Sequence, residues 1–417
     1  MEDDSKADDT CKDIARQLIE NEPGRKLNVI MGGGLRSFIS ESPGRRKDGR
    51  NLTDEWLEDH NHSEFVTDRY QMMNIEQETE HLLGIFASSH MHFNADRNAE
   101  LEPSLAEMTK TAIKVLKRKN LNGLLLVVEA GKIDLAHHYN NAFRALDDTL
   151  ALDEAIEVAV RSFGKVSFYL FQINNFIEMF IVDMSDSMII VTSDHASAVV
   201  YSGFATPKDY SILGMDKFLS NVNKKPYQLL LYSSGLGHDY FNESSATTDY
   251  RNSYHQATIP STWSNHAGDD VPLYAVGSLA NILFGGSMDQ TYIPHAIAFA
   301  MCLFDYKDRC YGHERRVESP YHRNPSKIHM LKQKLQEEFH KKPEVVKADP
   351  EILNEAVVEI NNFEVPENIF NKTEFDFYST SDLVSNLTDV DSGHTQKQSS
   401  LDLITFLFFF LILIAHV

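Results

Sequence analysis

Carboxylates and imidazoles of this chain follow or precede apolar runs at three places. The first is GLLLVVEAGKIDLAHH, which begins at Gly123, the second is VTSDHAS and the third is NHAGDD. Imidazole and carboxylate ligands favour zinc, and an all-oxygen position favours magnesium. We therefore predict a divalent-metal centre. Its six candidate ligands are Glu129, Asp134, His138, Asp194, His195 and His266.

The first stretch predicts a buried strand, a tight turn and a helix. The apolar run Leu124 to Val128 ends at Glu129, Gly131 interrupts it, and a helical pattern begins at Ile133. Asp134 and His138 are four residues apart, so they share one face of that helix. Alone, such a pair is more often found on an ordinary solvated helix face.

The other candidates also lie beside predicted strands. Asp194 and His195 follow the strand Ile189 to Thr192, and His266 precedes the strand Val271 to Val276. If these strands are parallel, their carboxyl ends share one edge of the sheet and the groups converge there. Taken alone, Asp194 could equally be a helix-capping or turn-capping aspartate, and His195 and His266 could be hydrogen-bonded loop histidines.

Composition places the chain in a broad class. Its 417 residues are 42% hydrophobic, which suffices for a large α/β domain, and the net charge of −22 argues against nucleic-acid binding. Helices are expected at Thr79 to Ala87, Leu105 to Lys117 and Leu152 to Val160, and the helix of the first stretch is expected to continue to about Leu146.

Two segments interrupt this α/β pattern and a third follows it. Residues 161–181 are an insertion rich in Phe and Ile, which we interpret as a retained intron read in frame. Residues 200–262 predict a loop-rich inserted subdomain, and residues 311–400 a polar stalk or linker.

The C-terminal residues 401–417 are almost purely apolar after a polar spacer. This pattern fits a signal for a glycosylphosphatidylinositol (GPI) anchor, and a tail-anchor helix is the alternative. Five glycosylation sequons agree with an exported protein at the extracellular face of the cell membrane. They lie at Asn51, Asn61, Asn242, Asn371 and Asn386.

The three metal-ligand stretches resemble those of the alkaline phosphatases, in the same order. VIMGGG, LEPSLAEMT and RALDDT resemble landmarks between them, and the likeness spans Cys11 to about Cys310. It is greatest to the animal, GPI-anchored branch. The resemblance implies a three-layer α/β/α sandwich with a mostly parallel central sheet. It also implies a catalytic domain over residues 1–310 with a crown subdomain at 200–262, a homodimer, and a disulfide between Cys302 and Cys310.

The same resemblance assigns roles to the candidate ligands. Asp134, His138 and His266 resemble ligands of a first zinc, Asp194 and His195 resemble ligands of a second, and Glu129 resembles a magnesium ligand. The implied reaction is hydrolysis of phosphate monoesters at alkaline pH through a phosphoserine.

This sequence departs from the family pattern in several places. The nucleophilic serine is not found, because neither Asp4-Ser5 nor Asp186-Ser187 has the strand-to-helix context that it needs. We therefore interpret the chain as truncated at its N-terminus and lacking N-terminal strands of the sheet, with the partner of Cys11 in the missing part. Ala87 occupies the position of a calcium-binding glutamate, which argues against a fourth metal.

Two functions remain open from the sequence. One is a phosphate-monoester hydrolase whose nucleophile lies outside this chain. The other is a catalytically inactive, membrane-anchored fragment that binds metal or partners. A phosphodiesterase or sulfatase of the wider superfamily is a third option, against which the contexts NHAGDDV and VEAGKIDLAHH argue.

Overall fold

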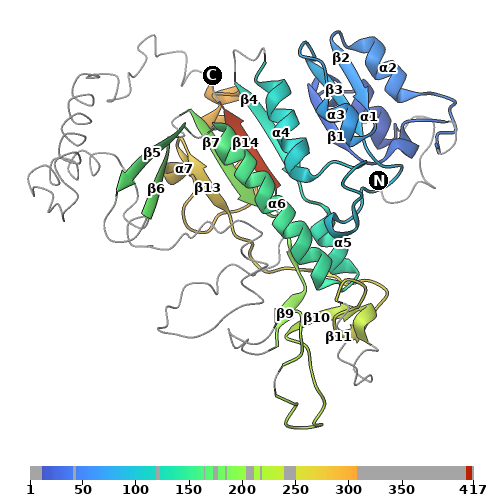
Figure 1. Ribbon diagram of the computed structural model, residues 1–417, viewed down its shortest axis with the longest axis vertical. Coiled ribbons are helices and arrows are strands. Elements are labelled where there is room, and N and C mark those ends of the chain that lie inside the picture. Colours follow the sequence, from blue (N-terminus) through green and yellow to red (C-terminus); the bar gives the residue numbers. More distant parts are fainter. Residues whose placement is uncertain are drawn as a thin grey trace, which may run out of the picture. The chain divides into compact units, whose positions relative to one another are not determined.

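The computed structural model describes residues 12–40, 44–118, 123–163, 165–171, 177–183, 186–202, 211–216, 218–238, 250–307 and 410–415. The chain, whose helices and strands are labelled in Figure 1, divides into two compact units. One unit comprises Met1–Phe284 with Asp389–Val417, and the other comprises Gly285–Thr388. All six candidate metal ligands belong to the first unit.

A three-stranded parallel sheet forms the N-terminal part of the first unit. Its strands are, in spatial order, β1 (Val29–Gly32), β3 (His81–Ile85) and β2 (Ser63–Val66). The accompanying helices are α1 (Ile14–Glu20), η2 (Gly24–Lys26), η3 (Leu35–Ser37), α2 (Leu52–Asp59) and α3 (Arg69–Met73). Trp56 of α2 and Leu83 of β3 are fully buried in one core, so the helices cover this sheet through apolar contacts.

The central strand of this sheet corrects a prediction. Residues 79–87 were expected to be helical, but β3 is a strand with a parallel neighbour on each side. Leu82 and Leu83 point to opposite faces of the sheet, and both are fully buried. A strand that is buried on both faces has no alternation of polar and apolar residues, so the pattern alone does not distinguish it from a helix.

A four-stranded sheet positions the candidate ligands. Its strands are, in order, β13 (Tyr274–Gly277), β7 (Ser187–Thr192), β14 (Phe410–Ala415) and β4 (Leu124–Glu129). β14 pairs antiparallel with both β4 and β7 (Figure 1), so β4 and β7 run in the same direction. β13 pairs antiparallel with β7. The ends of β4 and β7 that precede the ligands therefore lie at the same edge.

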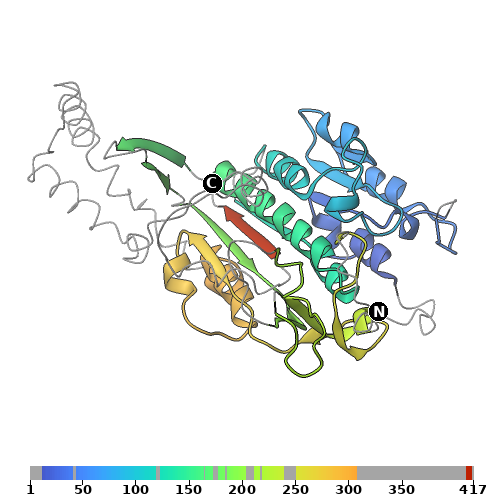
Figure 2. The same ribbon diagram turned by 60° about the horizontal axis from the view of Figure 1, so that its bottom comes forward.

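Two helices lie side by side along this sheet (Figure 2). They are α4 (Leu105–Leu116) and α6 (Ala142–Phe163), which contact each other as well as β4 and β7. Ser104 and Glu107 form a reciprocal capping box that starts α4. Ile113 and Leu152 bury the facing sides of the two helices in one core with Leu124 and Ile189. Helices packed on sheets confirm the predicted α/β class.

The helix after β4 is shorter than predicted. The strand, the turn at Gly131 and the helix α5 (Lys132–His138) are confirmed, but α5 ends before Tyr139 and α6 begins at Ala142. Asn140 causes the break, because its backbone is left-handed with a φ of 53°. The predicted boundary between the helices, near Leu146 to Leu152, is therefore wrong.

Smaller sheets complete the first unit. The region predicted as a loop-rich subdomain contains β9 (Val199–Tyr201), β10 (Leu230–Gly235) and β11 (Ala257–Pro260), in the order β11-β10-β9. A two-residue pairing joins β8 (Ala196–Ser197) to β12 (His266–Ala267). The segment 161–181, whose origin in an intron stays a prediction, contributes to two strands that pair antiparallel, β5 (Lys165–Phe171) and β6 (Ile177–Asp183). The remaining short helices are η4 (Asn94–Asp96) and α7 (Ala280–Leu283).

The described part of the second unit contains α8 (Tyr292–Ala300) and η6 (Phe304–Tyr306). Cys302 is disulfide-bonded. Its predicted partner Cys310 lies outside the described residues, as do Cys11 and the stalk 311–400, so the pairing stays a prediction. Among the helices that the structure describes, none combines the length and apolarity needed to cross a bilayer.

Two of the predicted glycosylation sites fall on described residues. Asn51 is the N-cap of α2, and its side chain accepts hydrogen bonds from the backbone and hydroxyl of Thr53. Asn61 is exposed in the turn after α2. Asn242, Asn371 and Asn386 lie outside the described residues. Glycosylation stays a prediction at all five sites.

Candidate metal centre

The helix α5 carries the first two ligands of the centre. β4 ends at Glu129, and α5 begins after Gly131, so Asp134 and His138 stand one turn apart near the strand end. His138 Nε2 lies 2.8 Å from Asp134 Oδ2. His138 Nδ1 lies 2.6 Å from the carbonyl oxygen of Ser264. A carbonyl only accepts hydrogen bonds, so Nδ1 carries the proton and Nε2 of the neutral ring is a bare lone pair.

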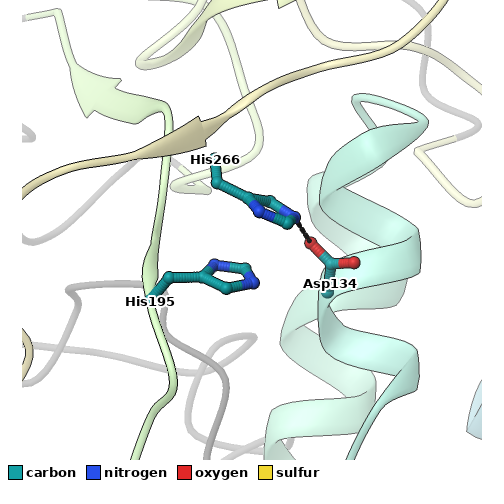
Figure 3. A group of neighbouring side chains, drawn as sticks. All are labelled: Asp134, His195 and His266. Atoms are coloured by element: carbon teal, nitrogen blue, oxygen red, sulfur yellow. Dashed lines mark ion pairs between the residues drawn. The ribbon is translucent and has the colours of Figure 1, made fainter. Parts of the chain in front are cut away.

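The pairing of β8 with β12 brings in the remaining histidines. His195 directly precedes β8, and His266 begins β12 opposite Ser197. The rings of His195 and His266 stack with their centroids 3.5 Å apart. Figure 3 shows both rings directed toward Asp134, which comes from α5 on the other side of the site. Ligand atoms of Asp134, His195 and His266 all lie within 4.8 Å of one another.

The ligand atoms of these groups face one another. His266 Nε2 lies 3.1 Å from His138 Nε2 and 3.2 Å from Asp134 Oδ1. That carboxylate oxygen is buried and accepts no hydrogen bond from the described residues. Acceptors in contact repel each other unless a proton or a cation lies between them. The donor set therefore fits a divalent cation.

Burial also disfavours charge on these side chains. Burial raises the pKa of Asp134, although the nearby imidazoles His138 and His266 oppose the rise. Burial and the neighbouring ring of His195 lower the pKa of His266. Both shifts favour the neutral forms, so the site poorly tolerates its own charges without compensation. A bound cation would supply that compensation.

Asp194 and Glu129 lie at the margin of this group. Asp194 Oδ2 is 3.4 Å from His195 Nε2, and Asp194 Oδ1 accepts a hydrogen bond from the backbone N–H of His195. Partial desolvation raises the pKa of Glu129, and the charge of Asp194 adds to the rise. The two carboxylates are therefore close enough to repel each other, as two ligands of neighbouring cations would.

The structure brings the six predicted ligands together unequally. Asp134, His138 and His266 contact one another directly, and His195 stacks on His266. Asp194 contacts His195, and Glu129 interacts with Asp194 through its charge. His195, which is predicted to bind a second zinc, stacks on His266, which is predicted to bind the first, and both assignments stay predictions.

Two contributors were missed by sequence reasoning. The Ser264 carbonyl orients His138, and the indole ring of Trp263 stacks on the same imidazole at 4.3 Å between centroids. Both residues immediately precede Asn265 and His266 in the sequence, and no spacing rule distinguishes them from loop residues. A backbone carbonyl leaves no mark in the sequence, so only the coordinates reveal the first contact.

Comparison with known proteins gives one consistent result. The family model described as alkaline phosphatase matches residues 1–303. An alkaline phosphatase of Gadus morhua is 36% identical over 313 residues, which cover 70% of this chain and 61% of that protein. A membrane-bound alkaline phosphatase of Bombyx mori is 33% identical over 313 residues, which cover 70% of this chain and 52% of that protein.

Among solved structures, a cold-active alkaline phosphatase from the psychrophile Shewanella sp. matches with a TM-score of 0.41 and 18% identity. That match covers 66% of this chain and 65% of the other. The chain spans about three fifths of the length of the Gadus morhua relative.

Proposed function

The chain belongs to the alkaline phosphatase family, and from this premise we propose that it forms the metal-binding part of a phosphate-monoester hydrolase. The observation that supports the proposal most strongly is the convergence of Asp134, His138 and His266, whose ligand atoms approach one another to 2.8, 3.1 and 3.2 Å. Since a partly buried cluster of carboxylate and imidazole groups is costly without a compensating charge, this arrangement is best understood as a metal site.

We assign two zinc ions and one magnesium ion to the six residues. Asp134, His138 and His266 would hold one zinc, Asp194 and His195 would hold the other, and Glu129 would hold magnesium. The nitrogen-rich and oxygen-only ligand sets suit these ions. When bound, such ions stabilise charge on phosphate oxygens and lower the pKa of an attacking hydroxyl. Ser264 would keep His138 in the tautomer that offers Nε2.

The attacking serine is expected from outside the described residues. Ser187, in the Asp-Ser pair noted above, is buried at the start of β7, whereas His195 follows the end of that strand. The strand's length therefore separates Ser187 from the ligands. If no such serine reaches the site, the alternative function applies, and the chain is a surface protein that binds metal but does not hydrolyse substrate.

The proposal includes a homodimer and a lipid anchor that fixes the protein to the extracellular face of the cell membrane. The apolar residues 403–417 and the five sequons support the membrane assignment. The relative from Bombyx mori is named as membrane-bound, which is consistent with it.

Zinc titration and a phosphatase assay test the proposal together. Zinc binding is measured by competition with a chromophoric chelator. Turnover of p-nitrophenyl phosphate is measured for the 417-residue chain and for the same chain extended by the coding sequence upstream of Met1. We expect both proteins to bind zinc and only the extended protein to turn over substrate. Absence of zinc binding would refute the metal centre, and equal turnover by both would refute the external nucleophile.

A further inference from the structure

The face of Trp263 covers a proposed metal ligand while much of the ring stays open to water. Its indole stacks on the imidazole of His138, with centroids 4.3 Å apart and an angle of 29° between the planes. Even so, 39% of Trp263 is exposed, whereas Trp56, the other tryptophan, is fully buried. An exposed indole beside a phosphate-binding centre can stack on a further ring.

Tyr139 extends this aromatic surface away from the metal centre. It follows His138 at the end of α5, and its ring makes a T-shaped contact with Trp263 at 5.2 Å between centroids. It is also 39% exposed. The same tyrosine forms part of the wall of a pocket of about 140 Å³. The pocket is lined by Phe93, Tyr139, Asn141, Arg144, Asn252 and Tyr254.

The size of the pocket suits a single ring. An apolar cavity of about 150 Å³ in another protein accepts benzene. Here three of the six lining residues are aromatic, and the asparagine side chains add polar groups at the same wall. Phe93 lies between two cations, with Lys132 Nζ at 3.8 Å and Arg144 Cζ at 5.3 Å from its centroid.

The guanidinium that lines the pocket is already paired. Arg144 Nε donates to Asp96 at 2.7 Å, and Arg144 Nη2 lies 3.3 Å from the Asn252 side-chain oxygen. A second anion would therefore have to compete with Asp96 for the guanidinium, whereas a neutral planar group would not. The pocket chemistry thus favours an uncharged ring over a second phosphate.

We propose that Trp263, Tyr139 and this pocket form an aromatic subsite for the alcohol part of the substrate. The favoured substrates are phosphate monoesters that carry a planar aromatic ring, which would lie on Trp263 and extend toward the pocket while the phosphate binds the metal centre. This inference rests on the proposed function. It names a substrate class for the same site.

Phosphonates test the subsite without turnover, because their carbon–phosphorus bond is not cleaved as an ester is. Binding of phenylphosphonate, methylphosphonate and inorganic phosphate to the zinc-loaded chain is measured by titration calorimetry and by quenching of tryptophan fluorescence. We expect phenylphosphonate to bind about tenfold more tightly than methylphosphonate and to quench emission, because Trp263 is the accessible tryptophan.

Variants separate the subsite from a packing role. Trp263→Ala should reduce the phenyl preference, which is the ratio of phenylphosphonate to methylphosphonate affinity at saturating zinc, to less than twofold, whereas Trp263→Phe should keep most of that ratio. Tyr70→Ala removes a more exposed aromatic ring from α3 (74% exposed) and should change neither affinity. If Trp263→Ala does not fold, Trp263→Phe and the quenching of the unaltered chain still decide the question.

The possible failures are distinguishable. If the zinc-loaded chain binds phosphate and methylphosphonate but binds phenylphosphonate no more tightly, the aromatic subsite is refuted and the metal centre stands. A phenyl preference that survives in Trp263→Ala also refutes the subsite. If the chain binds neither zinc nor phosphate, the proposed function fails, and the subsite fails with it.

Discussion

At the scale of single residues, the contacts of the His138 imidazole show how the site is built. His138 is held by a backbone carbonyl on one nitrogen, by an indole on its face, and by a carboxylate on its other nitrogen. Each contact restricts the ring, so Nε2 is directed into the cluster before any ion arrives. Preorganisation of this kind strengthens metal binding because little conformational freedom is lost on binding.

Replacing this ring should therefore disable zinc binding selectively. His138→Gln removes a nitrogen ligand and the hydrogen bond to Ser264, so we expect zinc affinity to fall by at least about 100-fold. His90→Gln changes an exposed histidine and is the matched control, with no expected change. Chelator competition measures both. Equal zinc affinity in His138→Gln and the unaltered chain would contradict the assignment.

A second residue, Asp148 on α6, makes folding depend on pH. Burial raises its pKa to about 7, although backbone N–H donation from Asn94 opposes the rise. The unfolded chain releases this proton near pH 4, so between about pH 4 and 7 the folded state holds a proton that the unfolded state lacks. The stability contributed by Asp148 therefore falls as the pH rises through this window.

The variant Asp148→Asn removes this pH dependence. It should stabilise the protein relative to the unaltered chain at pH 8, by at most about 4 kcal/mol, and by much less at pH 5. Urea unfolding of both proteins at the two pH values measures the difference. A stability difference that is the same at pH 5 and pH 8 would show that Asp148 does not carry the effect.

At the scale of elements, the break between α5 and α6 depends on one buried side chain. Asn140 has a φ of 53° and is fully buried. Its amide donates to the Ser234 carbonyl, and its side-chain oxygen accepts from the Gly237 N–H. The residue thus both turns the chain after His138 and joins that turn to β10 and the residues after it.

Asn140→Ala tests this double role. It keeps the left-handed strain and leaves two buried polar groups unpaired, so we expect a loss of about 3 kcal/mol or more. Asn140→Gly relieves the strain but not the lost hydrogen bonds, and should cost about 1 kcal/mol less. Chemical unfolding of both variants gives the comparison. Asn140→Gly being the less stable of the two would contradict the strain argument.

The elements also show what the sequence could and could not predict. The strand, turn and helix around Glu129 were predictable, because an apolar run, a glycine and a helical period follow one another within a few residues. The identity of β3 was not, since both its faces are buried. The pairing of β8 with β12 spans two residues a strand, too short for any periodicity, although it is what sets His266 beside His195.

At the scale of the whole molecule, the position of β14 was also unpredictable. The apolar C-terminal residues indicated a membrane signal, but residues 410–415 form a strand between β4 and β7. Apolar composition suits either location, because a buried strand and a lipid-facing segment both avoid water. The pairing of residues 410–415 depends on long-range contacts, which leave no local pattern in the sequence, and the membrane signal stays a prediction.

Removal of residues 403–417 should therefore disturb the sheet that positions the ligands. Without β14, β4 and β7 lose the backbone partner that they share, so we expect faster amide deuterium uptake in both strands and more self-association. Hydrogen exchange with mass spectrometry and size-exclusion chromatography measure these changes. The strands β1 to β3 provide an internal control, since β14 pairs with none of them. Unchanged exchange in β4 and β7 would contradict the pairing.

Because β14 pairs with both β4 and β7, its six residues cannot belong to the sheet and serve as an anchor signal at the same time. While its backbone amides and carbonyls are hydrogen-bonded to strands on both sides, this segment cannot be bound by the transamidase that attaches the anchor, and it cannot insert into the lipid bilayer. Lipid attachment would thus compete with completion of the fold. If the C-terminal tail is replaced by a lipid anchor, another strand must pair with β4 and β7 in its place, so that Glu129 and His195 keep their positions around the cations.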